Sequence, residues 1–199
     1  QIDPANNAVQ ALILSPTREL VQQIKKQLFK YTKYYDQKVF VEAVYGGEKI
    51  DRQINNLQRI THIIVATPGR LIDLIERGNI NLKEIKTLVL DEADEMLSMG
   101  FKQDLNRILK YTSGQRNTWL FSATMPNEIQ RIIKTYMDSN APRVEIDRNS
   151  MVNSNISHQF VKTTIKEKAS FIIRFLEVRQ AERGIIFGRT KAGTQNLTK

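Results

Sequence analysis

Three carboxylates, Asp91, Glu92 and Asp94, stand directly behind the apolar run 87–90. A short apolar run bounded by charge is typical of a strand buried on both faces of a parallel sheet. Ligands of such sheets bind just beyond the carboxyl ends of the strands. Asp91 is therefore a candidate to hold Mg²⁺, directly or through water, against a nucleotide phosphate, and Glu92 to orient or deprotonate an attacking water. The alternative is an ordinary strand end whose acids favour the next helix N-terminus.

Four other loops carry hydroxyl, glycine or basic residues, and each follows an apolar run that we predict to be a strand, at 11–15, 39–45, 62–66 and 118–121. Because carboxyl ends of parallel strands meet at one edge of a sheet, we expect all five loops to crowd along that edge. The four loops are Pro16, Thr17, Arg18 and Glu19; Gly46 and Gly47; Thr67, Pro68, Gly69 and Arg70; and Ser122, Ala123 and Thr124.

Helical patterns separate these strands. Helices are predicted from Thr17 to about residue 33, around Ile50, Ile54 and Leu57, over 71–76, in the region up to 111, and behind the loop at 122–126 through residue 137. A further strand is predicted at 143–146. Regular alternation of strand and helix predicts an α/β fold, with a parallel sheet, right-handed crossovers and helices on both faces.

A polar stretch at 149–157 without periodicity predicts a linker. The alternation then restarts with a strand at 158–162, a helix at 167–179 and a strand at 184–187. We therefore expect residues 1–148 to form a first domain without its N-terminal part, and residues 158–199 to be the beginning of a second. The chain starts without an initiator Met, which favours a start inside a longer protein.

The composition points to a polyanionic partner. The 199 residues carry a net charge of +9, and residues 151–199 hold nine Lys and Arg against three Asp and Glu. Basic residues scattered over a solvated surface are the alternative. The absence of cysteine excludes disulfides and thiolate metal sites and suits a reducing cytoplasm. No apolar run is long enough to span a bilayer and no signal peptide is present, so we expect a soluble, cytoplasmic protein.

The glycine and basic loops suit phosphate binding. Loops that enter helix N-termini present free backbone N–H groups, glycines allow close approach, and Arg18 or Arg70 can add bonds to phosphate or ribose. Such contacts carry no base information, so binding should be independent of sequence. Simpler alternatives stay open: a tight turn at Gly46 and Gly47, surface salt bridges for the arginines, and a turn with a helix cap around Ser122.

In this order and spacing, the motifs resemble those of the DEAD-box ATP-dependent RNA helicases. Residues 91–94, Asp-Glu-Ala-Asp, are the tetrad that names the family, the four other loops match its further first-domain motifs, and 185–187 with Thr190 is similar to the first motif of its second domain. The resemblance covers essentially the whole chain. It implies two RecA-like domains that close on ATP and a single RNA strand.

The resemblance also implies roles for individual residues. Asp91 would serve Mg²⁺ and Glu92 would be the catalytic base, while Asp94 and the Ser122, Ala123, Thr124 motif would couple nucleotide state to domain closure and unwinding. RNA would be contacted by the loops at 16–19, 46–47 and 67–70, and in the second domain by Phe187, Arg189 and Thr190.

The sequence contains no Gly-x-x-x-x-Gly-Lys-Ser/Thr phosphate loop, which the family places upstream of Pro16. We therefore expect these 199 residues alone neither to hydrolyse ATP efficiently nor to unwind RNA. The leading hypothesis is an RNA-stimulated ATPase and helicase that uses ATP and Mg²⁺. A second is an ATP-independent RNA-binding module or scaffold derived from a helicase. A third, an unrelated Mg²⁺-dependent phosphotransfer domain that uses Asp91, leaves the glycine and arginine loops unexplained.

Overall fold

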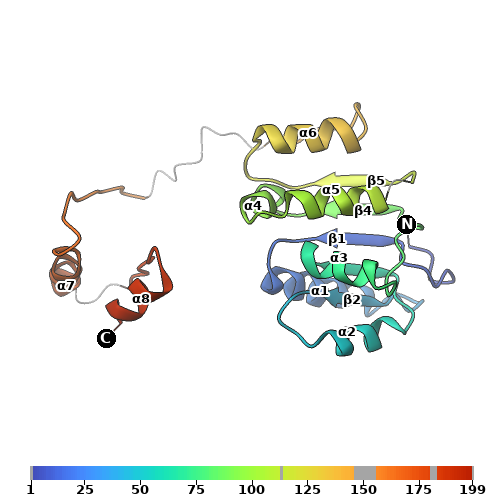
Figure 1. Cartoon of the computed structure of the whole chain (residues 1–199), viewed down its shortest axis with the longest axis horizontal. Helices are drawn as coiled ribbons and strands as arrows, with labels where there is room; N and C mark the ends of the chain where they lie inside the picture. Colours follow the sequence, from blue (N-terminus) through green and yellow to red (C-terminus); the bar gives the residue numbers. More distant parts are fainter. Residues whose placement is uncertain (1, 113, 146–155, 180–182, 199) are drawn as a thin grey trace. The chain divides into compact units, whose positions relative to one another are not determined.

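Five parallel strands form the central sheet, in the order β2–β3–β1–β4–β5 (Figure 1). The strands are β1 (Ala11–Leu14), β2 (Val41–Val44), β3 (Ile63–Ala66), β4 (Thr87–Leu90) and β5 (Asn117–Leu120). In the central strand β1, Leu14 lies opposite Ala66 of β3 and Leu90 of β4. The predicted α/β class with a parallel sheet is confirmed.

The computed structural model describes residues 2–112, 114–145, 156–179 and 183–198. The chain divides into two units, Gln1–Arg143 and Val144–Lys199, and the sheet belongs to the first. None of the helices in these described ranges is both long and apolar enough to cross a membrane.

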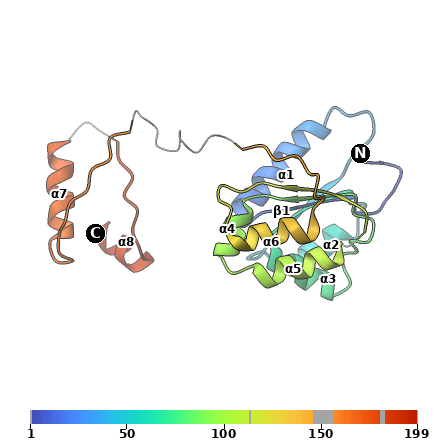
Figure 2. The same cartoon turned by 90° about the horizontal axis from the view of Figure 1, so that it is seen from above.

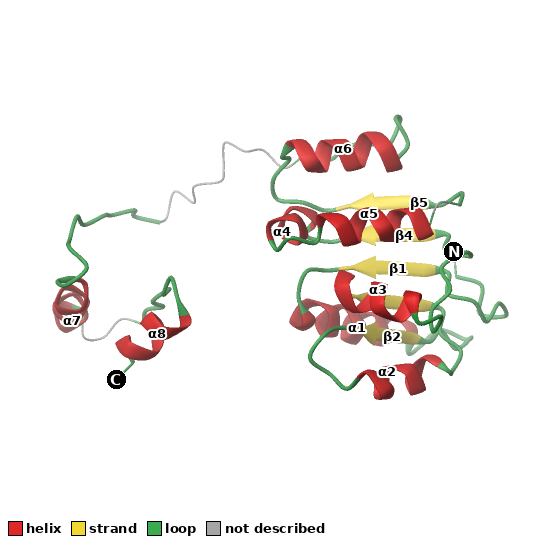
Figure 3. Ribbon diagram, viewed as in Figure 1, coloured by secondary structure: helices red, strands yellow, loops and turns green. Residues whose placement is uncertain are grey.

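Helices cover both faces of the sheet (Figures 2 and 3). Val21 of α1 (Arg18–Thr32) packs on Ala43 and Val65 on one face. The opposite face carries the larger core, with β-strand leucines such as Leu12 and Leu88 fully buried. The helices on that side are α2 (Ile50–Leu57), α3 (Pro68–Glu76), α4 (Ala93–Ser98), α5 (Lys102–Tyr111) and α6 (Asn127–Tyr136).

The helix starts follow from local chemistry. Thr17 caps α1, since its side chain accepts a hydrogen bond from the backbone N–H of Leu20 at 3.3 Å. Helix α3 begins three residues earlier than predicted, because Pro68 occupies its first turn, where the missing N–H costs nothing and the fixed φ favours the helix.

The second unit contains α7 (Lys168–Val178) and α8 (Lys191–Leu197). The helix predicted at 167–179 is confirmed, but the strands predicted at 158–162 and 184–187 are wrong: their residues form no strand, and Phe160 and Ile185 are exposed. Two short parallel strands bury too little apolar surface to be stable by themselves. Residues 143–145 likewise form no strand; residue 146 and residues 149–155 of the predicted linker lie outside the described residues.

Candidate functional site at the carboxyl edge of the sheet

The loops singled out in the first unit lie along one edge of the sheet. Ladder hydrogen bonds continue one residue past the strands: the Thr67 N–H donates to the Val44 carbonyl at 2.9 Å, and the Asp91 N–H donates to the Leu14 carbonyl at 2.9 Å. These bonds fix the start of each loop beside its neighbour. The expectation that the five loops lie along one edge of the sheet is confirmed, because all the strands are parallel.

An acidic pocket of about 420 Å³ opens beyond β4 and β5. Its lining consists of the four carboxylates Asp91, Glu92, Asp94 and Glu95 together with Phe121, Ser122 and Ala123. Within the part of the chain that the structure describes, the carboxylates of Asp91 and Glu92 form neither a hydrogen bond nor an ion pair. Both are therefore available to a ligand, a metal ion or a water.

Glu92 has a strained backbone. Its φ of 50° and ψ of 52° place it in the left-handed region, and it is the only non-glycine residue with positive φ among those described. Such a conformation costs about 1–2 kcal/mol and persists only where the surroundings impose it. The next residue, Ala93, is held to the segment after β5, because its N–H donates to the Phe121 carbonyl at 3.0 Å. Strain of this kind clusters at functional sites.

The residues of this pocket fit a Mg²⁺ ion that would be coordinated jointly by a protein carboxylate and a nucleotide phosphate. No cluster of three or more His, Cys, Asp or Glu side chains among the described residues is arranged to hold a metal ion alone. Mg²⁺ does not require one, because it commonly keeps several waters and takes one or two carboxylates plus substrate phosphates. The unpartnered carboxylate of Asp91 at the strand end is a suitable donor of that kind.

Asp94 joins the loop after β4 to the loop after β5. Its Oδ2 accepts from the Thr124 N–H at 2.9 Å and from the Thr124 hydroxyl at 2.7 Å, and the Ser122 hydroxyl donates to the Thr124 carbonyl at 2.6 Å. Desolvation raises the pKa of Asp94, but the hydrogen bonds that its carboxylate accepts, above all from Thr124, lower the pKa by more, so the net pKa lies below the ordinary value. The three residues form one hydrogen-bonded unit, and no helix cap uses Thr124.

We expect Thr124→Val to lower the free energy of unfolding by about 1 kcal/mol at neutral pH, because it removes one hydrogen bond to a carboxylate that is largely solvated. A carboxyl group whose pKa is lowered by folding contributes stability above its unfolded pKa, and that contribution is lost as the pH falls through the folded pKa. Urea unfolding at pH 7 and pH 3 measures both effects. The difference between wild type and Thr124→Val should shrink at pH 3, whereas Thr135→Val, an exposed control in α6, should show none at either pH.

On the other side of the edge, two arginines and a glycine turn form a basic cluster, which we define as Arg18, Tyr45, Gly47, Glu48 and Arg70. The Arg18 guanidinium lies 5.8 Å from the Tyr45 ring centroid, and Arg70 Nη1 donates to the Glu48 carbonyl at 3.1 Å. Gly47 has φ 86°, a value that L side chains rarely adopt. The cluster joins the loops after β1, β2 and β3.

The two arginines differ in availability. The Arg18 side chain is half-exposed, and its one acidic contact is long, with 4.0 Å between Arg18 Nε and Glu19 Oε1. Its guanidinium can therefore reach a ligand. Arg70 is mostly buried and lies 3.9 Å from Asp73, in addition to its bond to Glu48. Arg70 therefore holds two loops together whether or not it also contacts a ligand.

The remaining first-unit residues occupy the expected loops. Thr67 precedes α3 and its side chain makes no capping bond, which leaves that hydroxyl free at the start of the helix; Pro68 and Gly69 follow in the first turn. Pro16 precedes the Thr17 cap. The second-unit residues are exposed, and the Thr190 hydroxyl caps α8 by accepting from the Gly193 N–H at 3.0 Å. Phe187 is 90% exposed and Arg189 is also exposed.

Two further residues at this edge, Tyr45 and Ser15, are not among those singled out from the sequence. Tyr45 receives a hydrogen bond at its hydroxyl from the Gln22 amide at 2.8 Å and lies beside Arg18. An aromatic directly before two glycines and near basic residues could have pointed to it. Ser15 is fully buried with an unpartnered hydroxyl at the end of β1, and nothing in the sequence distinguishes it from a strand residue.

With this geometry established, similarity to known proteins decides the family. A family model described as "DEAD/DEAH box helicase" matches residues 1–132. The chain belongs to the DEAD/DEAH box helicase family. Its Asp91–Asp94 tetrad is therefore the family's name-giving motif, and the RecA-like assignment of the sheet is confirmed by the solved structures it resembles.

Two of the curated relatives are bacterial proteins. The chain is 46% identical over 199 residues to "ATP-dependent RNA helicase CshA" of Listeria monocytogenes, covering 100% of this chain and 38% of that protein. It is 42% identical over 200 residues to "DEAD-box ATP-dependent RNA helicase CshA" of Geobacillus kaustophilus, covering 100% and 42%. The chain thus spans about two fifths of the length of these relatives.

Two solved structures share the fold. A DEAD box protein from the hyperthermophile Methanococcus jannaschii superposes with a TM-score of 0.68 at 36% identity, over 99% of this chain and 52% of that one. The yeast DEAD-box splicing factor Prp28 superposes with a TM-score of 0.65 at 38% identity, over 68% of this chain and 32% of that one.

Proposed function

We propose that this chain is part of an ATP-dependent RNA helicase, in which it holds single-stranded RNA by the backbone and supplies Asp91 and Glu92 to ATP hydrolysis. One observation carries the proposal: an acidic pocket with two unpartnered carboxylates and a basic cluster with a glycine turn share one sheet edge. The acidic pocket suits metal and water, and the basic cluster suits phosphate. The names of the relatives support the pairing of ATP with RNA.

On the nucleotide side, the two carboxylates take different roles. Asp91 would hold Mg²⁺ through water, and the ion would neutralise charge on the nucleotide phosphates. Glu92 has no partner, so its carboxylate can orient a water and accept its proton. The strained turn at Glu92 fixes the direction in which its side chain leaves the backbone. This favours a role in placing the attacking water over a purely electrostatic role.

The hydrogen bonds between Asp94 and Thr124 would couple the nucleotide state to domain closure and unwinding. A change at Asp91 or Glu92 reaches Asp94 through one turn of backbone, and Asp94 is bonded to Thr124 of the next loop. Ser122 and Ala123 line the acidic pocket directly. Nucleotide state in the pocket would therefore bias the loop after β5, which is the physical content of coupling to domain closure and unwinding.

On the RNA side, the loops at 16–19, 46–47 and 67–70 would contact phosphate and ribose, and Phe187, Arg189 and Thr190 would add contacts from the second unit. The exposed guanidinium of Arg18 and the free hydroxyl of Thr67 are suitable donors. None of these groups needs a base edge, so binding should not depend on sequence. The lack of cysteine is compatible with the cytoplasmic location that we propose.

We expect Arg18→Ala in the full-length protein to weaken single-stranded RNA binding about three- to tenfold, because an exposed charge-assisted contact to phosphate is lost. The loss should be the same for two RNAs of unrelated sequence, and the salt dependence of log K should become shallower by about 0.7. Fluorescence anisotropy over a salt series measures both. The matched control is Arg77→Ala, at the far end of α3. A loss confined to one of the two sequences would contradict backbone recognition.

A further inference from the structure

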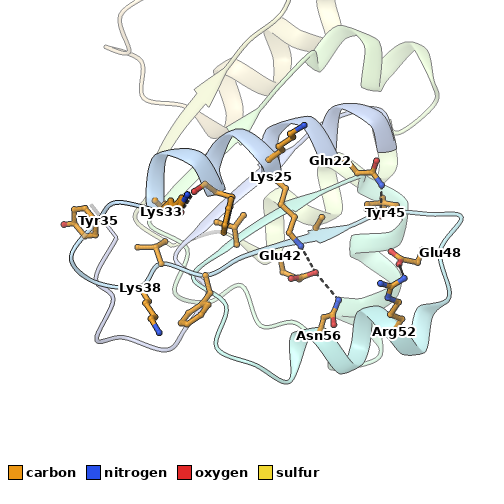
Figure 4. Close-up of a pocket in the computed structure, with 17 residues that line it drawn as sticks. Gln22, Lys25, Lys33, Tyr35, Lys38, Glu42, Tyr45, Glu48, Arg52 and Asn56 are labelled. Carbon is orange, nitrogen blue, oxygen red and sulfur yellow. Dashed lines mark hydrogen bonds and ion pairs between the residues drawn. The ribbon is translucent and has the colours of Figure 1, made fainter.

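A groove of about 790 Å³ runs along the outer edge of the sheet, between α1, the edge strand β2 and α2 (Figure 4). We call it the β2 groove. One end is formed by Gln22 and Tyr45, and Tyr45 also belongs to the basic cluster. The other end is formed by the connection from α1 to β2, where Lys33, Tyr35 and Lys38 lie. The groove therefore begins where the proposed RNA site ends.

The groove carries an excess of positive charge. Five Lys and Arg side chains line it against two carboxylates, Glu42 and Glu48, and both carboxylates are already paired. Lys25 Nζ lies 3.0 Å from Glu42 Oε1, and Arg52 Nη1 lies 3.1 Å from Glu48 Oε1. The other three cations, Lys26, Lys33 and Lys38, form no ion pair within the described residues. Their charge is left for an external anion.

Aromatic side chains alternate with these cations. Phe29, Tyr35 and Phe40 line the groove and are 63%, 61% and 44% exposed. Exposed aromatic side chains gathered on one surface mark an interaction site. Aromatic faces interleaved with lysines form the surface on which the bases of a single strand stack while its phosphates are neutralised.

The geometry of α1 places these groups in one row. Lys26, Phe29 and Lys33 recur at intervals of three and four residues, so they share one helix face. From Gln22 to Lys33 the row is about 16 Å long. That length accommodates roughly five stacked nucleotides at 3.4 Å each.

A peptide strand added to β2 is less suited to this groove. The edge of β2 is crossed by a polar bridge, in which Glu42 Oε1 accepts from Lys25 and also from the Asn56 amide at 3.3 Å (Figure 4). Charged side chains over an edge strand are a usual obstacle to strand addition. The bridge leaves the aromatic and lysine row on α1 accessible.

We propose that the β2 groove is a second contact for single-stranded RNA, which extends the strand beyond the loops at the carboxyl edge. The inference rests on the proposed RNA-binding function and adds a site outside its motifs. The groove would bind by stacking and charge, so it would lengthen the RNA footprint by about five nucleotides without adding sequence preference.

The test compares two RNAs in the full-length protein: one of about five nucleotides, which can occupy the loops at the carboxyl edge without extending into the groove, and one of about twelve nucleotides, which fills the loops and reaches the groove as well. The double variant Lys26→Gln, Lys33→Gln should lose about tenfold affinity for the long RNA, with a salt slope shallower by about 1.4, and bind the short RNA as wild type does. The matched control Lys30→Gln, Lys83→Gln removes the same charge outside the groove.

A second variant and its control test the contribution of the aromatic side chains. Phe29→Ala should weaken long-RNA binding about tenfold, whereas Tyr31→Ala, on the same helix but outside the groove, should not. Unaltered affinity of the groove variants for long RNA would overturn the inference and leave the groove to an acidic protein partner. Equal losses for short and long RNA would overturn it too. If wild type binds neither RNA, the proposed function itself fails.

Discussion

Glu92→Gln is expected to lower RNA-stimulated ATP hydrolysis by the full-length protein about 10²–10⁴-fold, the range attributed to loss of a general base. The substitution preserves size and leaves the hydrogen-bonded turn in place, but an amide cannot accept the proton of the attacking water. RNA binding in the presence of ATP should persist, because the basic cluster is untouched. Phosphate release and RNA anisotropy measure the two properties separately.

The control is Glu95→Gln. Glu95 lines the same acidic pocket from the first turn of α4, so it tests whether the effect follows from removing any negative charge there. We expect less than about threefold loss of turnover, since electrostatic effects of one exposed carboxylate are small. Normal turnover in Glu92→Gln, or equal losses in the two variants, would refute the assignment of Glu92 as the base.

The largest expected effect on stability is that of Leu90→Ala. Leu90 is fully buried at the end of β4, opposite Leu14 of β1 and Leu120 of β5. Truncation leaves a cavity between the sheet and the helices that cover this face, and we expect the free energy of unfolding to fall by about 3 kcal/mol. The same residue positions Asp91, so catalysis should suffer as well.

Urea unfolding followed by the fluorescence of Trp119, the only tryptophan in the sequence, measures the loss. Trp119 lies in β5 next to Leu120 and so reports on the same part of the sheet. The matched control is Leu97→Ala in α4, where a half-buried leucine should cost about 1 kcal/mol. Equal costs for the two leucines would contradict the view that β4 is anchored by its buried face.

Much of the first unit could be predicted from the sequence, because its signals are local. The strand 87–90 is observed with the predicted bounds, and α1 follows directly on Thr17, where the helix is predicted to start. Each of these depends on a few neighbouring residues whose chemistry is unambiguous. The placement of the loops at one edge followed from strand direction alone, since parallel strands leave no other choice.

What depended on distant partners was not predictable. Trp119 lies in the strand predicted at 118–121, yet it is 57% exposed, because the only described helix on its face of the sheet, α1, packs instead over β2 and β3. The strands predicted at 158–162 and 184–187 lack the neighbours that a parallel ladder needs.

The site shows the same division. Glutamate carries no signal for a positive φ, so the strained turn at Glu92 could be found only in the structure. The sequence suggested Arg70 as a phosphate donor, whereas the structure adds a bond to the Glu48 carbonyl that fixes the loops. The roles of the individual loop residues in RNA binding and coupling stay predictions.

The most direct measurement of the central claim is phosphate release from ATP by the full-length protein, with no RNA and with each of two single-stranded RNAs of unrelated sequence. The arrangement of an acidic pocket and a basic cluster on one edge predicts that both RNAs stimulate hydrolysis, and by the same factor. An unchanged rate with either RNA would contradict the proposed function, as would stimulation by one sequence alone.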